Sequence, residues 1–225
     1  MTESTTHLLL VRHGENDYVV EGRLAGRTPG VHLNAKGRGQ AQAVVERLAD
    51  MPVAAIYSSP LERCRETAAP LAQARSLPVR THPGLLEVDY GAWQGGKLKE
   101  LGKTPEWQRV QHHPSRFRFP GGETLREMQN RLVDTVETIR ADHPGEVVAV
   151  FGHSDPIKSV LAFYLGTPID LFQRIMIDPT SVSIVALREA GCTILRINDA
   201  GPLPDLKPPA DKRDEAQAQP EGGCT

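Results

Sequence analysis

Histidine or arginine side chains follow three short apolar segments of the chain. These segments are residues 7–11, followed by Arg12 and His13; residues 53–57, followed shortly by Arg63; and residues 146–151, followed by Gly152 and His153. Such runs are typical of buried strands, and ligands bind at the carboxyl ends of strands in α/β sheets. We therefore expect the two arginines and two histidines to converge on one anion-binding pocket, which suits a phosphoryl group.

His13 has the neighbours that a phosphoryl-transfer nucleophile needs. Histidine is among the side chains that form covalent intermediates, and its neutral imidazole can attack phosphorus beside an anion site. Arg12 brings a permanent positive charge, and Gly14 would allow backbone N–H groups to approach an anion closely. A histidine after a strand is by itself more often structural, so this interpretation depends on the three segments together.

Alternating strands and helices are expected to position these residues. The pattern predicts strands at residues 7–11, 53–57, 78–82 and 146–151, helices at residues 35–50 (with Asn34 as N-cap), 61–74, 156–165 and after residues 121–124, and a terminal hairpin at residues 181–187 and 192–197. This alternation predicts an α/β fold, a single-domain three-layer α/β/α sandwich with a largely parallel central sheet and helices on both faces. Residues 85–119 have a mixed pattern, and we expect them to cap the edge of the sheet.

Length and composition fit one globular domain with a tail. The chain has 225 residues, of which 39% are hydrophobic and 24% charged. This is enough chain for a sizeable core, which we expect within a catalytic domain at residues 1–199. Five of the 18 prolines fall in residues 200–225, among charged and small residues, and this composition predicts a disordered tail.

Charge and cysteine content exclude several classes of protein. The formal net charge of −2 does not fit a general nucleic-acid binder, which would carry basic clusters. No apolar run approaches the roughly 18 residues that a membrane span needs, and the polar N-terminus carries no signal peptide. Cys64, Cys192 and Cys224 are scattered, so a soluble protein of the reducing cytoplasm is predicted. The sequence does not fix the oligomeric state, although homodimers are the commonest soluble assembly.

Five motifs in series resemble the histidine phosphatase superfamily, and more closely its phosphoglycerate-mutase-like branch. The motifs are LVRHGE at residues 10–15, SSPLER at 58–63, LEVDYGAWQG at 86–95, FPGGET at 119–124 and VFGH at 150–153. Each motif alone is weak, but the five occur in the expected order and cover approximately residues 8–187. The resemblance implies the fold of that branch and a phosphohistidine mechanism without a metal or organic cofactor.

The resemblance also implies a role for each motif residue. His13 would be the nucleophile that becomes phosphohistidine, and Glu87 would be the general acid that protonates the leaving oxygen. Arg12, Arg63 and His153 would bind the phosphoryl oxygens and stabilise the transition state. Because Glu87 must be protonated to act, we expect partial burial and the nearby phosphate charge to raise its pKa.

Four further residues stand near the expected pocket. Tyr90 and Arg23 match positions that line the substrate mouth in the family. Asp89 and Asp155 are alternative acids, although solvated loop carboxylates are commoner at such positions.

The chain departs from the family pattern at several positions around the pocket. Asn16 stands where relatives usually have Ser or Thr, but its amide can still donate to phosphate. Val19 and Val20 replace a Trp-Asn pair, Ala25 stands where mutases often carry a hydroxyl, and Ser154-Asp155-Pro156 replaces the usual glycine. These changes leave the phosphoryl pocket intact and alter its surroundings, so substrate specificity is the least transferable property.

Two alternatives to a phosphatase acting on a small phosphate ester remain. Only 36 positions separate Glu87 from Glu123, whereas glycolytic mutases carry a longer insertion there, so a phosphatase is favoured over a phosphoglycerate-type phosphomutase. A non-catalytic phospho-ligand binding module would lack the nucleophile or the acid, and both positions are filled. A zinc hydrolase is disfavoured because there is no HExxH or comparable ligand spacing.

The substrate is not fixed by the sequence. Basic residues of the expected cap could recognise a second anionic group or could form an ordinary solvated loop; they are Arg109, Arg116, Arg118, His112 and His113. Trp93 and Trp107 could flank a substrate, although packing is the commoner role of such aromatic residues.

Overall fold

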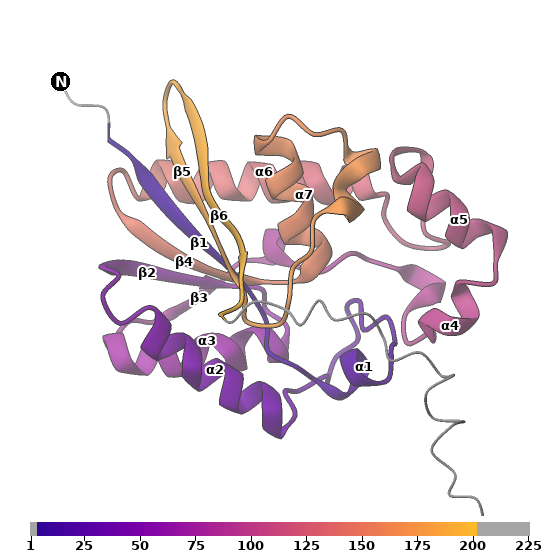
Figure 1. The fold of residues 1–225 in the computed structure, drawn as a ribbon, viewed down its shortest axis with the longest axis horizontal. Coiled ribbons are helices and arrows are strands. Elements are labelled where there is room, and N and C mark those ends of the chain that lie inside the picture. Colours follow the sequence, from indigo (N-terminus) through magenta and orange to yellow (C-terminus); the bar gives the residue numbers. More distant parts are fainter. Residues whose placement is uncertain (1–3, 202–225) are drawn as a thin grey trace, which may run out of the picture.

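A six-stranded sheet organises residues 4–201, the part of the chain that the computed structural model describes. The strands are β1 (Thr6–Arg12), β2 (Val53–Ser58), β3 (Val79–Thr81), β4 (Val147–Gly152), β5 (Val182–Arg188) and β6 (Gly191–Asp199), in the spatial order β3-β2-β4-β1-β5-β6. The first four in this order pair in parallel, and β5 and β6 form the antiparallel hairpin at one edge (Figure 1). The predicted, largely parallel sheet with its terminal hairpin is therefore confirmed.

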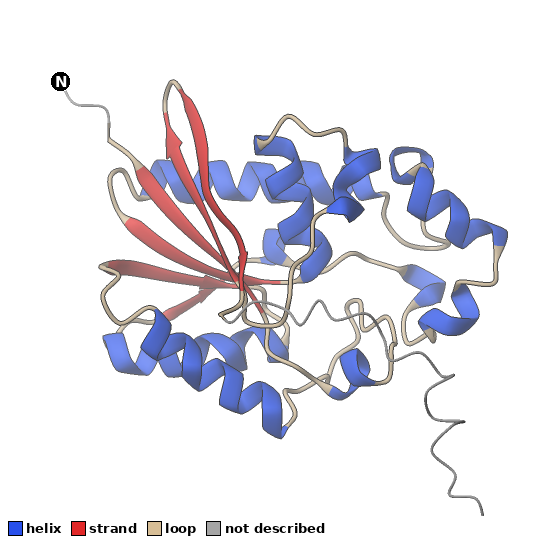
Figure 2. Cartoon of the chain, in the orientation of Figure 1, coloured by secondary structure: helices blue, strands red, loops and turns tan. Residues whose placement is uncertain are grey.

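Helices cover both faces of the sheet (Figure 2). The α-helices are α1 (Asp17–Val20), α2 (Ala35–Arg47), α3 (Glu62–Arg75), α4 (Leu98–Leu101), α5 (Pro105–His112), α6 (Leu125–Asp142) and α7 (Ser154–Tyr164). Within β1, Leu8 and Leu10 pack in the cluster that includes α6 and α7, whereas Leu9 and Val11 pack in the cluster that includes α2 and α3. Because successive strand residues point to opposite faces, one short apolar run supplies both cores of the predicted three-layer sandwich.

Local capping chemistry sets the starts of the helices. The Asn34 side chain accepts from the Gly37 N–H and caps α2, as the sequence predicts. Thr124 and Glu127 form a capping box at the start of α6. The helix predicted over 156–165 in fact begins at Ser154, because Pro156 lies in its first turn, where the missing N–H has no intrahelical partner.

Residues 83–116 form short helices beside the carboxyl edge of the sheet (Figure 1). Between α3 and α6 lie α4, α5 and the 3-10 helices η1 (Pro83–Leu85), η2 (Gly91–Trp93) and η3 (Pro114–Arg116), and a further 3-10 helix, η4 (Ile169–Arg174), follows α7. Trp93 contacts Trp107, Phe117 and Phe119, with ring centroids 5.4–6.1 Å apart, which gives this segment an aromatic core.

Two further sequence predictions are a disordered C-terminal tail and the lack of a membrane-spanning segment. The predicted tail lies, from residue 202 on, outside the described residues. Within residues 4–201, no helix is long and apolar enough to cross a membrane.

Candidate active site

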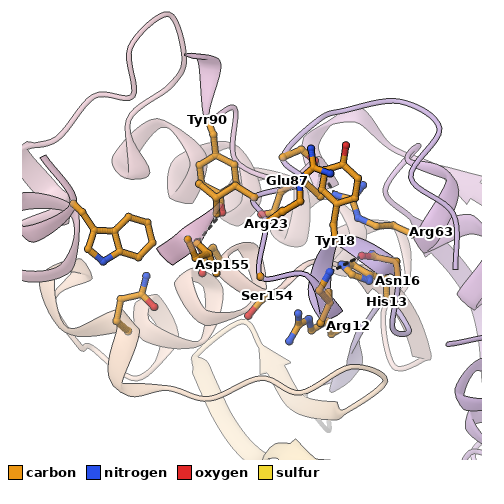
Figure 3. A pocket seen from close by; sticks show the side chains of 18 of the residues that line it. Arg12, His13, Asn16, Tyr18, Arg23, Arg63, Glu87, Tyr90, Ser154 and Asp155 are labelled. Atoms are coloured by element: carbon orange, nitrogen blue, oxygen red, sulfur yellow. Dashed lines mark hydrogen bonds between the residues drawn. The ribbon is translucent and has the colours of Figure 1, made fainter. Parts of the chain in front are cut away.

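The carboxyl ends of three neighbouring strands lead into one pocket. β1, β4 and β2 are adjacent in the sheet, and they are followed by His13, by His153 and by the turn into the helix that carries Arg63. The structure brings Arg12, His13 and Arg63 together around a pocket of about 330 Å³, which Glu87 also lines (Figure 3). The positions at strand ends predict this convergence for Arg12, His13 and Arg63, whereas the fourth predicted residue, His153, does not line the pocket.

The His13 ring is held in one tautomer. Its Nδ1 lies 2.7 Å from the Gly14 carbonyl oxygen, and a carbonyl can only accept, so Nδ1 carries the proton and Nε2 keeps a free lone pair. Burial, followed by the positive charges of Arg63 and Arg12, lowers the pKa of His13 well below its usual value. The ring is therefore neutral near pH 7 and its Nε2 is a competent nucleophile.

Unpartnered hydrogen-bond donors surround this ring. Among the described residues, six buried side-chain N or O atoms have no partner, and four of them are nitrogens of pocket-lining residues: Arg12 Nε, Asn16 Nδ2, Arg63 Nε and Arg63 Nη1. Buried donors are almost always satisfied, so this group calls for an acceptor-rich anion. Within residues 4–201, no group of three or more His, Cys, Asp or Glu side chains is arranged to hold a metal ion.

Asn16 shows how the departure from Ser or Thr is accommodated. The residue is fully buried, and its Oδ1 accepts the Val19 N–H at 3.0 Å as the N-cap of α1. The other half of the amide, Nδ2, is one of the unpartnered donors. A single amide can therefore start α1 through its oxygen and still donate to a phosphoryl oxygen through its nitrogen.

Arg63, which lines the pocket, and His153, which does not, form a fully buried pair. Arg63 Nη2 donates to the Gly26 carbonyl oxygen at 2.8 Å and lies 3.1 Å from His153 Nδ1. The other ring nitrogen of His153, Nε2, lies 2.9 Å from Ser59 Oγ. Burial, followed by the charge of Arg63, lowers the pKa of His153 well below its usual value. The ring centroid of His153 lies 5.4 Å from that of His13, but His153 does not line the pocket.

Glu87 enters the pocket from the loop between η1 and η2. It is 8% exposed, its Oε1 accepts the Val88 N–H at 3.0 Å, and its Oε2 lies 3.8 Å from His153 Nδ1. Burial, followed by the negative charge of Asp155, raises the pKa of Glu87 to about 7. The predicted shift thus arises in the protein itself, without a bound phosphate. A carboxyl group with this pKa can hold a proton near neutral pH.

The mouth of the pocket carries the remaining predicted residues. Tyr90 donates its hydroxyl proton to Asp155 Oδ2 at 2.9 Å, and both residues line the pocket (Figure 3). Arg23 also lines it, with its guanidinium 4.3 Å from the Tyr18 ring centroid. Of the two alternative acids, Asp155 therefore faces the pocket, whereas Asp89 pairs with Arg27 at 3.5 Å outside it.

Gly14 has a different role from the predicted one. Its N–H donates to Thr67 Oγ1 at 3.0 Å, and the residue does not line the pocket. A Cβ at this position would lie 2.7 Å from the Gly37 carbonyl oxygen. The glycine thus allows β1 to continue past α2 at close range, and its amide is not available to an anion.

The basic cap residues face solvent. Arg109, Arg116, Arg118, His112 and His113 are all exposed and do not line the pocket. Instead, α5 turns Trp107 and Gln111 toward the pocket, because residues four apart share a helix face. The ordinary solvated-loop interpretation therefore holds for the basic set.

Sequence reasoning missed several lining residues. Tyr18, Gln111, Ser154 and Gln173 all line the pocket. Neutral polar side chains in short helices and loops give no pattern of their own, so only the tertiary structure reveals them. The unusual Ser154-Asp155 pair, which replaces a glycine of the family, was the one available signal.

Comparison with known proteins agrees with the geometry of the site. The family model described as histidine phosphatase superfamily (branch 1) matches residues 8–200. The chain is 32% identical over 193 residues to phosphoserine phosphatase 1 of Hydrogenobacter thermophilus, covering 85% of this chain and 91% of that protein. It is 35% identical over 161 residues to the metal-independent phosphoserine phosphatase of Arabidopsis thaliana, covering 69% and 67% of the two proteins. The solved structure of Bacillus stearothermophilus YhfR superposes with a TM-score of 0.82 at 29% identity, covering 87% of this chain and 98% of that one. With this match over most of its length, the chain belongs to branch 1 of the histidine phosphatase superfamily.

Proposed function

We propose that this phosphatase hydrolyses phosphomonoesters of small metabolites through a phosphohistidine on His13, with Glu87 as the general acid. The observation that supports the proposal is the group of four unpartnered donors beside a neutral His13 whose Nε2 is free. A phosphoryl group would supply acceptors for these donors and an electrophile for that nitrogen.

The first half-reaction transfers the phosphoryl group to the enzyme. His13 Nε2 forms a bond to phosphorus while the bond from phosphorus to the ester oxygen breaks. Glu87 gives its proton to the departing oxygen, so that the leaving group is released as a neutral alcohol. The donors of Arg12, Asn16 and Arg63 bind the equatorial oxygens, where the negative charge of the transition state is spread.

The second half-reaction returns the enzyme to its starting state. Glu87, now a carboxylate, takes a proton from a water molecule, whose oxygen forms a bond to phosphorus. The bond from phosphorus to Nε2 breaks, inorganic phosphate leaves, and Glu87 is again protonated. Both steps use only side chains of the pocket.

His153 can assist in either half-reaction. A hydroxyl can donate or accept, so Ser59 is compatible with either tautomer of the His153 ring. The Arg63 guanidinium can only donate, so in this arrangement His153 Nδ1 accepts from it and the ring proton is on Nε2, toward Ser59. Donation from Nδ1 to a phosphoryl oxygen would require Arg63 to turn toward the anion and the ring proton to move to Nδ1.

The class of substrate is proposed from pocket size and relatives. A pocket of about 330 Å³ is at the small end of ligand sites, which suits a small phosphate ester better than a phosphoprotein segment. Two of the relatives are named phosphoserine phosphatases, so phosphoserine is the first substrate to test.

Cys64 and Cys192 are free thiols, which supports the cytoplasmic location that the sequence suggests.

The test is direct detection of the phosphoenzyme. The protein is mixed with a ³²P-labelled phosphate ester in the presence of EDTA, quenched in alkali and assayed for acid-labile, alkali-stable protein phosphate. We expect labelling and phosphate release by the unchanged chain and by His112→Ala, an exposed control, and neither from His13→Ala. Phosphate release without labelling that persists in His13→Ala would contradict the mechanism, and transfer of label mainly to a second metabolite would indicate a mutase.

A further inference from the structure

Two of the five sequence motifs, residues 86–95 and 119–124, lie against each other outside the phosphoryl-binding part of the pocket. Ala92 N–H donates to the Pro120 carbonyl oxygen at 2.8 Å, and Glu123 N–H donates to the Asp89 carbonyl oxygen at 3.0 Å. A Cβ at Gly91 would lie 2.1 Å from the Pro120 oxygen, and Gly91 has a φ of +52°. The glycine therefore permits a close backbone contact between the segment after Glu87 and the segment before α6.

Glu123 joins three parts of the chain at this contact. Its Oε1 accepts from Arg27 Nη2 at 2.9 Å, from the Asp89 N–H at 2.9 Å and from Arg131 Nη2 at 2.7 Å, and its Oε2 accepts from Arg131 Nε at 3.1 Å. The carboxylate is largely buried and makes four hydrogen bonds. Such a network fixes three parts of the chain relative to one another. They are the loop that carries Arg27, the loop that carries Glu87 and Asp89 (the acid loop), and α6.

Arg131 extends this network to the backbone around the general acid. Its Nη1 donates to the carbonyl oxygens of Gly84 at 2.9 Å and Leu86 at 2.8 Å, and its Nη2 donates to the Glu87 carbonyl oxygen at 3.0 Å. Arg27 Nε donates to the same Glu87 oxygen, also at 3.0 Å. The planar guanidinium of Arg131, which projects from α6, thus holds the main chain between Gly84 and Glu87 through its hydrogen bonds.

We propose that Arg131 and Glu123 are positioning residues for the Glu87 carboxyl. Neither lines the pocket, and both act through the backbone of the acid loop. The inference rests on the proposed function, because it assumes that Glu87 is the proton donor. A proton donor has to lie within hydrogen-bond reach of the leaving oxygen, so a small displacement of this loop would weaken proton transfer more than binding.

The test compares two substrates that differ in their need for an acid. The leaving oxygen of 4-nitrophenyl phosphate departs without protonation, whereas that of glycerol 3-phosphate is strongly basic and requires it. The kcat/KM value reports the steps up to release of the first product, so it excludes hydrolysis of the phosphoenzyme. We expect Arg131→Met to lower kcat/KM for glycerol 3-phosphate by about 10- to 100-fold and to change that for the aryl ester by less than about threefold.

Matched variants separate positioning from charge and from folding. Arg131→Lys keeps the charge but loses the fork, so we expect the same selective loss in a milder form. If Arg131→Met does not fold, Glu123→Gln replaces it in the test, since glutamine retains the shape of the acceptor. We expect Glu123→Gln to show the same selective loss of kcat/KM for glycerol 3-phosphate. Arg126→Met replaces an exposed arginine of the same helix and should leave both substrates unaffected.

Two outcomes would overturn the inference, and they are distinguishable. Equal losses on both substrates in Arg131→Met, beside a selective loss in Glu87→Gln, would show that the network is merely structural. A Glu87→Gln variant without any preference for the aryl ester would show that the proposed acid is wrong, and the positioning role would fail with it.

Discussion

At the scale of single residues, the burial of Glu87 that suits its proposed role as an acid also destabilises the folded protein when Glu87 ionises. The folded protein holds this carboxyl buried beside the negative charge of Asp155, and Arg63 and Arg12 only partly offset the resulting rise in its pKa. The same burial that keeps the acid protonated makes its ionised form unfavourable in the folded state.

Glu87→Gln should therefore stabilise the protein in a pH-dependent manner. The pKa of Glu87 is raised from 4.5 to about 7, so its contribution to stability is complete below pH 4.5 and is lost as the pH rises through 7. Glutamine does not ionise and still offers an oxygen to the Val88 N–H. We expect the variant to gain on the unchanged chain from pH 5 upward, reaching on the order of 3 kcal/mol above pH 7, in urea unfolding.

The control for this measurement is Glu46→Gln, an exposed residue of α2. Its unfolding free energy should follow that of the unchanged chain at every pH. A constant difference between Glu87→Gln and the unchanged chain from pH 5 to 8 would contradict the pKa shift.

The convergence of these side chains on one pocket could be predicted because their types and places in the sequence are restrictive. Arg12, His13 and Arg63 follow strand ends, and this position alone indicates convergence. The effect of Asp155 on Glu87 was harder to predict. The sequence suggests Asp155 only as an alternative acid, and its influence on the pKa of Glu87 depends on how the tertiary structure places the two carboxyl groups. Gly14 was misinterpreted because a glycine beside a histidine does not reveal whether it faces a ligand or a neighbouring helix.

At the scale of elements, α6 carries both core packing and site architecture. Its apolar stripe, including Met128, Leu132 and Val136, is buried in the larger core cluster, and Arg131 on the same helix holds the acid loop. The capping box of Thr124 and Glu127 begins the helix directly after Glu123. The N-terminal part of α6 therefore combines the capping box with the residues that we propose to position Glu87.

Thr124→Ala should destabilise the protein by about 1 kcal/mol, the usual cost of losing an N-cap side chain. Thr138→Ala is the matched control, since Thr138 is exposed on the same helix and its hydroxyl bonds only to the Asp134 carbonyl oxygen. We expect the control to be neutral, because the higher helix propensity of alanine offsets the loss of this exposed hydrogen bond. Urea unfolding at pH 7 measures both values, and equal losses in the two variants would contradict the role of the cap.

Regular elements were predictable and the cap region was not, for a physical reason. The central strands are short continuous apolar runs buried on both faces, and the long helices have one apolar face each, so both patterns are visible in the sequence. The segment around Trp93 and Trp107 consists of short helices held by aromatic contacts between residues far apart in the chain. Its conformation is decided by tertiary packing, which a local pattern does not record.

At the scale of the whole molecule, the pocket draws on parts of the chain that are distant in sequence. Arg12 and His13 come from the end of β1, Asn16 from the start of α1, and Arg63 from α3 on one face of the sheet. Their unpartnered buried donors cost free energy in the folded protein, because in the unfolded chain water would satisfy them. A tetrahedral oxyanion would restore those hydrogen bonds and join these elements through one ligand.

Inorganic phosphate or orthovanadate should therefore raise the melting temperature of the whole domain in a concentration-dependent manner. A ligand that binds only the folded state at 100 times its Kd adds about 2.7 kcal/mol to the unfolding free energy. We expect the unchanged chain and Arg65→Met, which replaces an exposed arginine of α3, to show this shift, and Arg63→Met to lose most of it.

Differential scanning calorimetry measures the melting temperatures, and sodium chloride at matched ionic strength provides the reference. Arg63→Met also leaves the Gly26 carbonyl oxygen and His153 Nδ1 without their donor, so the shift of each variant is measured from its own melting temperature without the anion. An equal anion-induced shift in both variants would mean that the oxyanion binds elsewhere.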